Sequence, residues 1–200
     1  MADYPFFAYL YRLRYIERWS LMRNMVKENV AEHSYHVAVL VHVLCTIANE
    51  IYEKNVDTGA AVSAALFHDI TETFTGDIPT PIKHHNPEIL KNFRDIEQKA
   101  AERLSGMIPE PLRSIYEPML KPAKNENTDI RSYVKAADLL DAYLKCESEL
   151  SAGNGEFAVA KKQIEQSIKK LGMPETDYFL SYLAPSFEKT LDEMARIDDD

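Results

Sequence analysis

The apolar residues of this chain recur at the spacing of an α-helix, and no segment alternates in the manner of a β-strand followed by a hairpin turn. The clearest stripe runs from about residue 32 to about residue 50 and comprises Val37, Leu40, Val41, Leu44 and Ile47. Similar patterns predict helices at about 5–16, 58–73, 87–106, 110–120, 127–151, 155–171 and 176–196. Pro185 is expected to kink or split the last helix. The predicted fold class is all-α.

The length and composition agree with one helical domain. The chain has 200 residues, enough to bury a substantial core, and only 6 of them are glycine. We find no internal repeat or low-complexity tract that would mark a boundary between domains. A single domain spanning residues 1–200 is therefore expected.

The net charge limits the partners that the protein can bind. It is −9 at pH 7, and a field of that sign repels the phosphate backbone of nucleic acids. A nucleic-acid polymer is therefore not an expected partner. A small phosphorylated ligand in a locally positive pocket remains compatible with the charge.

The cysteines and the N-terminus indicate the compartment. Cys45 and Cys146 each lie in an apolar helical pattern without a second ligand at metal-binding spacing, so we expect two free, buried thiols. The first fifteen residues lack the apolar core of a signal peptide. No uninterrupted apolar run approaches the ~18 residues of a membrane span. We expect a cytoplasmic protein without a membrane partner.

Titratable residues gather where one predicted helix ends, in the segment "ALFHDITETFTGD". His68 and Asp69 point about 100° apart on a helix, yet both can reach one ion near its end, and Glu72 flanks the same position. An imidazole with carboxylates suits Mn, Co, Zn or Fe. Alternatively, His68 is half-buried and the two carboxylates decorate a frayed helix end, because a His-Asp pair often arises by chance.

Two other segments supply candidate ligands. His33 lies at the head of the long apolar helix, with Asn29 or Ser34 as candidate caps. Asp138 lies within an apolar helix, where an unpaired carboxylate would cost several kcal/mol unless a cation or strong donors meet it. Lys135 offers an ordinary salt bridge, and Asp141 is a competing carboxylate three positions later.

The order H … HD … D resembles that of the HD-domain metal-dependent phosphohydrolases. Five segments together are similar to the bacterial 5′-deoxynucleotidases of that superfamily, over about residues 5–195: "RWSLMRN", "ENVAEHS", "FHDITETFTGDIPTPIK", "AADLLDAYLKC" and "AGNGEF". The resemblance implies a single HD-domain helical bundle with one divalent ion, typically cobalt or manganese. The implied ligands are His33, His68, Asp69 and Asp138. The match of "KAAD" and "AYLKC" on either side favours Asp138 over Asp141.

The resemblance also implies catalytic roles. Glu72 has a catalytic assignment in the family and is our candidate for general acid/base work. Asp77 matches a position that contacts substrate and can take part in proton transfer. Arg18 matches the arginine that orients the phosphate, which suits a guanidinium fork. A surface ion pair of Arg18 with Glu17 or Glu28 is the alternative.

The remaining implied roles concern the substrate. The resemblance places it against Arg18, Trp19, His33, Asp69, Asp77, Ile78, Pro79, Thr80 and Asp138. The tryptophan ring is implied to crowd the 2′ position of the sugar, which would admit hydrogen and refuse hydroxyl. The alternative is that this single tryptophan is a core residue.

The expected function is metal-dependent hydrolysis of deoxyribonucleoside 5′-monophosphates by a homodimer. A triphosphate hydrolase or phosphodiesterase would need more basic groups around the pocket than Arg18 and Lys83 provide. A non-catalytic nucleotide sensor could dispense with Glu72 and with part of the ligand set, yet all of these residues are present.

Overall fold

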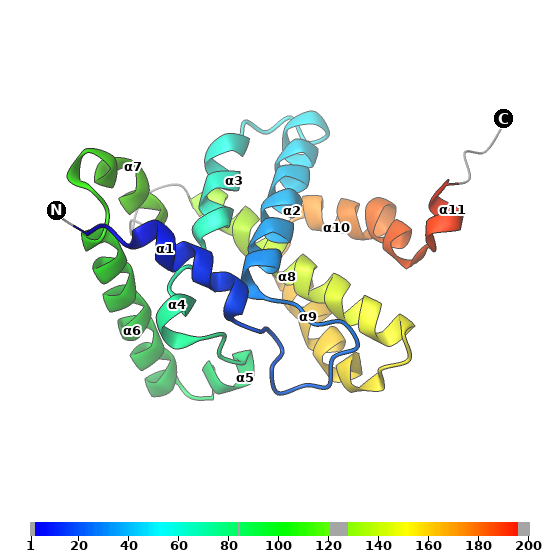
Figure 1. The fold of residues 1–200 in the computed structure, drawn as a ribbon. Coiled ribbons are helices and arrows are strands. Elements are labelled where there is room, and N and C mark those ends of the chain that lie inside the picture. The colour runs from blue at the N-terminus through cyan, green and yellow to red at the C-terminus, as the bar shows by residue number, and fades with distance from the viewer. Residues whose placement is uncertain (1–2, 84, 121–127, 196–200) are drawn as a thin grey trace.

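The computed structural model describes residues 3–83, 85–120 and 128–195, and these ranges are built from helices (Figure 1). The main helices are α2 (Val30–Glu50), α3 (Thr58–Phe67), α6 (Pro87–Gly106), α7 (Glu110–Leu120), α8 (Thr128–Ser151) and α9 (Ala158–Leu171). Short helices are α1 (Phe6–Leu10), α4 (Glu72–Thr75), α5 (Thr80–Lys83), α10 (Pro174–Tyr178) and α11 (Leu191–Ala195). The described residues contain one isolated β-bridge, Glu17–Asn29, and no strand. The all-α prediction is confirmed.

The main hydrophobic core lies where α2, α3 and α8 pack against one another, in the middle of Figure 1. Helix α2 contributes its predicted apolar stripe, including Val41 and Leu44, which are fully buried. The facing residues of α3 and α8 are largely alanines, which let the helix backbones approach closely: Ala61, Ala65, Ala136 and Ala137. Side chains that leave this junction therefore start from three firmly packed helices.

A second apolar cluster lies on the side of α1, α6 and α7. Its buried members are Phe6, Ile70, Ala101, Leu104, Ile108 and Leu120. Ile70 belongs to the turn after α3, so this cluster anchors that turn from outside the main core. The segment that carries the His-Asp pair is consequently held on two sides.

Helix α2 is long enough and apolar enough on average to span a membrane. It contains no uninterrupted apolar run of that length, so it was not identified from the sequence. In the fold, 56% of its most apolar window is buried inside the protein, as expected for the central helix of a globular core. Cys45 of α2 and Cys146 of α8 are buried free thiols, as predicted.

The start of α2 is fixed by a capping box. The Asn29 side chain accepts hydrogen bonds from the backbone N–H groups of Ala31 and Glu32, and the Glu32 side chain accepts one from the backbone N–H of Asn29. These bonds satisfy N–H groups that a helix start leaves without a partner. His33 lies in the first turn after this cap, so its ring projects from a well-defined helix end.

The helix predicted to reach about residue 73 stops earlier. Helix α3 ends at Phe67, and residues 68–71 form tight turns before α4 begins at Glu72. The bonds here join residues three apart, such as Ile70 N to Phe67 O and Glu72 N to Asp69 O. Such bonds wind the chain more tightly than an α-helix does. The prediction was wrong at this boundary. Because the helix ends at Phe67, His68 and Asp69 lie in the turn and not on a helix face.

The last predicted helix is divided into shorter pieces. Residues 174–195 form α10, a π-helical turn (Phe179–Leu183), a 3-10 turn (Ala184–Glu188) and α11. Pro185 lies in the 3-10 turn and splits the segment, one of the two predicted outcomes. Helix α5 adds a short helix in the "DIPTPIK" segment predicted to be a loop. Residues 127 and 196, the ends of two predicted helices, lie outside the described ranges.

The core model predicts a large cost for shortening a central side chain. Leu44→Ala should lower the free energy of unfolding by about 2–5 kcal/mol, because it leaves a cavity between packed helices. Urea denaturation measures this cost. Leu191→Ala, at a position that is 77% exposed, is the control and should cost less than about 1 kcal/mol. Equal losses in the two variants would contradict this description of the core.

Candidate active site

The four predicted metal ligands converge. The ring centroids of His33 and His68 lie 5.2 Å apart. Ligand atoms of His33, His68 and Asp138 all lie within 4.8 Å of one another. Asp69 joins them, since its Oδ2 lies 3.1 Å from His68 Nε2 and 3.4 Å from His33 Nε2. Helices α2 and α8 and the turn after α3, which are distant in sequence, thus meet at one point.

Hydrogen bonds orient both imidazoles. His33 Nδ1 lies 2.6 Å from Asp141 Oδ2, and His68 Nδ1 lies 2.7 Å from the backbone oxygen of Ala65. These oxygens accept a hydrogen bond from Nδ1–H, so in the neutral ring the lone pair is on Nε2. Both Nε2 atoms are buried, and neither makes a hydrogen bond to a described residue. Two nitrogens without hydrogen bonds that face carboxylates form the kind of donor set that divalent ions bind.

The electrostatics of the cluster also fit a cation. Burial alone would lower the pKa of His33, but Asp138, Asp141 and Asp69 raise that pKa well above its ordinary value. Burial would raise the pKa of Asp69, but His68 and His33 lower it well below its ordinary value. The pKa of Asp138 is lowered in the same way, against its burial, by His33 and Lys135. The cluster therefore keeps ionised carboxylates and attracts positive charge to their centre.

Asp138 and Asp141 occupy opposite sides of the His33 ring. Asp138 Oδ1 lies 3.5 Å from Nε2, on the side of His68 and Asp69, whereas Asp141 meets Nδ1. Asp138 also accepts a hydrogen bond of 2.8 Å from Lys135, the salt bridge considered from the sequence. Of the two carboxylates, Asp138 is thus placed to share an ion with His68, and Asp141 is placed to orient His33.

Arg18 lies beside this cluster. Its Nη1 donates to Glu28 and lies 3.3 Å from Asp141 Oδ2. The ion pair with Glu28 is the alternative raised from the sequence, yet the pair is not on the open surface, because both side chains are only 11% exposed. Asp141 therefore contacts a predicted ligand and the predicted phosphate-binding residue together. The three-residue spacing from Asp138 on α8 was the sequence signal for Asp141, which we had considered only as a competing ligand.

Glu72 begins α4 and is buried next to the cluster. Burial, together with the carboxylates of Asp69 and Asp77, raises its pKa to about 9. Lys83 Nζ of α5 lies 3.9 Å from Glu72 Oε1, while Oε2 has no hydrogen bond to a described residue. A protonated carboxyl group with a free oxygen can act as a proton donor near neutral pH.

The segment after α4 lines the same region. Gly76 has φ = 70°, a conformation that suits glycine, and it turns the chain between Glu72 and Asp77. Asp77, Ile78 and Pro79 are half-buried. The backbone oxygen of Pro79 accepts bonds from α5, so the segment is anchored to that helix. The side chain of Thr80 lies outside the described part of the chain.

Trp19 has an unusual backbone conformation. Its φ is 56°, in the left-handed region that bulky residues rarely occupy. Its ring packs at 5.4 Å from the ring of Phe157, and the Arg18 guanidinium carbon lies 5.9 Å from the indole. The side chain is half-buried rather than fully enclosed. Strained residues often cluster at functional sites, where surrounding contacts hold them.

Comparisons with known proteins identify the family. A family model described as "5'-deoxynucleotidase YfbR-like" matches residues 5–187. A 5′-deoxynucleotidase of Cronobacter sakazakii is 44% identical over 196 residues, which cover 98% of each chain. This chain belongs to the YfbR-like 5′-deoxynucleotidase family.

Solved structures show the same fold. An HD-domain phosphohydrolase from Listeria innocua is 27% identical, with a TM-score of 0.79, over 91% of this chain and 87% of that chain. An HD phosphohydrolase of cyanophage S-2L, solved with dA and one catalytic Zn²⁺, matches with a TM-score of 0.63 at 18% identity, over 90% of this chain and 96% of that chain. The fold of this YfbR-like protein is therefore the HD-domain fold.

Metal removal and return should change its stability. An ion that binds only the folded state, present at 100 times its dissociation constant, adds about 2.7 kcal/mol, which corresponds to a rise in Tm of roughly 5–10 °C. Differential scanning fluorimetry of the chelator-treated protein, with Mn²⁺, Co²⁺ or Zn²⁺ added singly, measures the shift. Asp69→Ala should abolish it. If none of these ions raises the Tm of the unmodified protein, the cluster is not a metal site.

Proposed function

We propose that this protein hydrolyses deoxyribonucleoside 5′-monophosphates to deoxynucleosides and inorganic phosphate. The observation that carries the proposal is the convergence of two orphaned Nε2 atoms, from His33 and His68, with the carboxylates of Asp69 and Asp138. Membership of the YfbR-like family supports the same activity.

His33, His68, Asp69 and Asp138 are proposed to hold one divalent transition metal ion, with Co²⁺ or Mn²⁺ as the expected activators. Two nitrogen and two oxygen donors suit either ion, and also Zn²⁺ or Fe²⁺. When bound, such an ion supplies positive charge for phosphoryl oxygens and makes a nucleophilic water more acidic. The same residues His33, Asp69 and Asp138 border the position that the substrate phosphate would take.

Arg18 is proposed to orient the phosphate. Both of the described hydrogen bonds of its side chain are made by Nη1, with Glu28 and with Asp141, which leaves Nη2 to donate to a phosphate oxygen. The two carboxylates hold the side chain in one position, so little conformational entropy is lost when substrate binds. A guanidinium so fixed can pair with a phosphate dianion in a defined geometry.

Glu72 is proposed as the general acid for the leaving 5′-oxygen. Its raised pKa keeps it protonated near neutral pH, and its free Oε2 has no competing hydrogen bond among the described residues. Asp77 contributes to that raised pKa and is the second candidate for proton transfer. Asp77, Ile78, Pro79 and Thr80 are proposed to contact the nucleotide.

Trp19 is proposed to select deoxyribose over ribose. A rigid indole held against the 2′ position would exclude a hydroxyl group on steric grounds. The positive φ of Trp19 and its contact with Phe157 support a ring that is held in place rather than free. The homodimer, implied by the family resemblance, and the cytoplasmic location, expected from the sequence, remain part of the proposal.

A metal add-back assay tests the substrate. Chelator-treated protein, supplied with Mn²⁺ or Co²⁺, should release phosphate from dAMP faster than from AMP or dATP. Phosphate release is measured for the three nucleotides under the same conditions, and Asp69→Ala reports any contaminating phosphatase. A preference for dATP would contradict the proposed monophosphatase activity. Equal cleavage of AMP and dAMP would contradict the proposed selectivity for deoxyribose.

The proposed acid predicts a specific kinetic loss. Glu72→Gln should lower kcat by about 10²–10⁴-fold, because the leaving oxygen loses its proton donor. Glu72 donates while it is protonated, so activity of the unmodified enzyme should decline as pH rises through the pKa of Glu72, and the variant should lack this decline. Glu97→Gln, which removes another partner of Lys83 at 3.4 Å, should keep the activity. A Glu72→Gln variant with normal kcat would exclude the role.

A further inference from the structure

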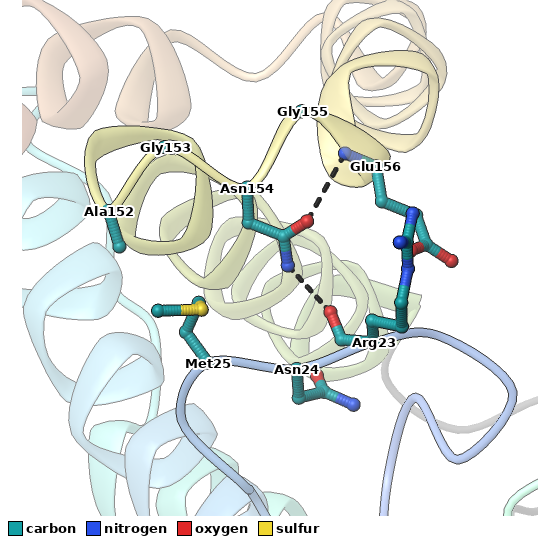
Figure 2. Close-up of a pocket in the computed structure, with 8 residues that line it drawn as sticks. All are labelled: Arg23, Asn24, Met25, Ala152, Gly153, Asn154, Gly155 and Glu156. Carbon is teal, nitrogen blue, oxygen red and sulfur yellow. Dashed lines mark hydrogen bonds and ion pairs between the residues drawn. The ribbon is translucent and has the colours of Figure 1, made fainter.

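The loop that carries Arg18 and Trp19 is held by the distant end of α8. We call residues 18–26 the Trp19 loop. Figure 2 shows its second half beside the turn Ala152–Glu156, where together they line an open cavity of about 630 Å³. "AGNGEF", the segment that forms this turn, has no role in the proposed chemistry. Its contacts with the Trp19 loop indicate one.

Glu149 is the centre of these contacts. It is buried, and its Oε2 accepts hydrogen bonds from the backbone N–H of Met25 at 2.9 Å and from Asn154 Nδ2 at 2.8 Å. Its Oε1 accepts from the N–H of Val26 at 3.2 Å and from Lys145 Nζ at 2.5 Å. Despite burial, these donors lower the pKa of Glu149 to about 2. A buried carboxylate that is fully supplied with donors fixes the backbone that donates to it.

Other residues extend this grip along the loop. Asn154 Nδ2 also donates to the backbone oxygen of Arg23 at 2.6 Å, as drawn in Figure 2. Lys145 donates to the backbone oxygen of Val26. Phe157, fully buried, packs against the Trp19 ring. We call Lys145, Glu149, Asn154 and Phe157 the α8 clamp.

Hydrogen bonds within the loop connect the residues held by the α8 clamp to Trp19. Asn24 Nδ2 donates to the backbone oxygens of Trp19 at 3.1 Å and Met22 at 3.0 Å, and it immediately precedes the residue that Glu149 binds. A tryptophan with φ of 56° relaxes unless its surroundings hold it. Phe157 of the α8 clamp contacts the Trp19 ring itself, and the rest of the clamp holds residues 23–26 of the loop.

We infer that Glu149, through the α8 clamp, is a positioning residue that fixes the Trp19 indole and thereby sets the preference for the sugar. This inference rests on the selectivity proposed above. Helix α8 carries Asp138 near its middle and Glu149 eleven residues later, near its C-terminal end, about 16 Å along the helix axis. One rigid helix therefore sets the distance between Asp138, a proposed metal ligand, and the Trp19 loop, which is proposed to select the sugar.

The experiment compares Glu149→Gln and Asn154→Ala with a matched control. Glu147→Gln removes a carboxylate from the same helix that pairs with Lys161 of α9 and not with the loop. Asn154→Ala leaves the Glu149 carboxylate paired with Lys145, so it tests the clamp even if Glu149→Gln fails to fold. Trp19→Ala is the reference for complete loss of selectivity. Its ratio of kcat/KM for dAMP to kcat/KM for AMP is the value that the clamp variants should approach.

Three readouts are measured. Trp19 is the single tryptophan of the chain, so its fluorescence reports the loop directly and without turnover. Both clamp variants should show red-shifted emission and stronger acrylamide quenching. Their dAMP/AMP ratio should fall at least tenfold, toward that of Trp19→Ala, while the dissociation constant for Mn²⁺ changes less than twofold. Glu147→Gln should match the unmodified protein in all three measurements.

The outcomes separate the two ideas. Folded clamp variants with unchanged fluorescence overturn the positioning role, and changed fluorescence with an unchanged nucleotide ratio overturns its part in selectivity. If the unmodified enzyme itself cleaves AMP as well as dAMP, the proposed selectivity fails, and the clamp is then judged by fluorescence alone.

Discussion

The concentration of negative charge around two imidazoles, His33 buried and His68 partly buried, is the constraint on which the rest of this structure depends. Asp69, Asp138 and Asp141 all contact His33, and Glu72 and Glu28 lie beside them. Carboxylates brought this close repel one another unless positive charge lies between them. The positive charge of Arg18 lies on the Asp141 side, and the two Nε2 atoms face Asp69 and Asp138 on the other side. The divalent cation proposed for this site would complete the balance.

The positions at which the helices begin or end bring these charged groups together. The capping box places His33 in the first turn of α2, and the tight turns after Phe67 release His68 and Asp69 from the α3 helix. Alanines between α3 and α8 let their backbones approach. Helix α8 then carries both the centre of the site and the contacts that hold the Trp19 loop.

Much of this arrangement could be predicted from the sequence. The apolar periodicity predicted the boundaries of α6 and α7 as the structure has them, and the ordered H … HD … D pattern named four residues that the structure brings together. Their role as metal ligands, and the choice of Asp138 over Asp141, stay predictions. A carboxylate in an apolar helix signals that it needs a partner, but the partner's identity depends on helices distant in sequence.

The features that the sequence did not provide depend on tertiary contacts. The end of α3 at Phe67 follows from i to i−3 bonds and from the anchoring of Ile70 in the second apolar cluster, which no local pattern reports. The raised pKa of Glu72 comes from burial and from Asp69 and Asp77. The sequence around Glu149 does not distinguish it from other acidic residues. Its role is visible only from its hydrogen bonds to residues 25 and 26 of the Trp19 loop.

The most direct measurement is an anomalous difference map from a crystal of the protein soaked with Mn²⁺. The account predicts one strong peak within coordination distance of His33 Nε2, His68 Nε2 and the carboxylates of Asp69 and Asp138. A peak bound instead through Asp141 and Glu28 on the Nδ1 side of His33, or no peak between the imidazoles, would contradict it.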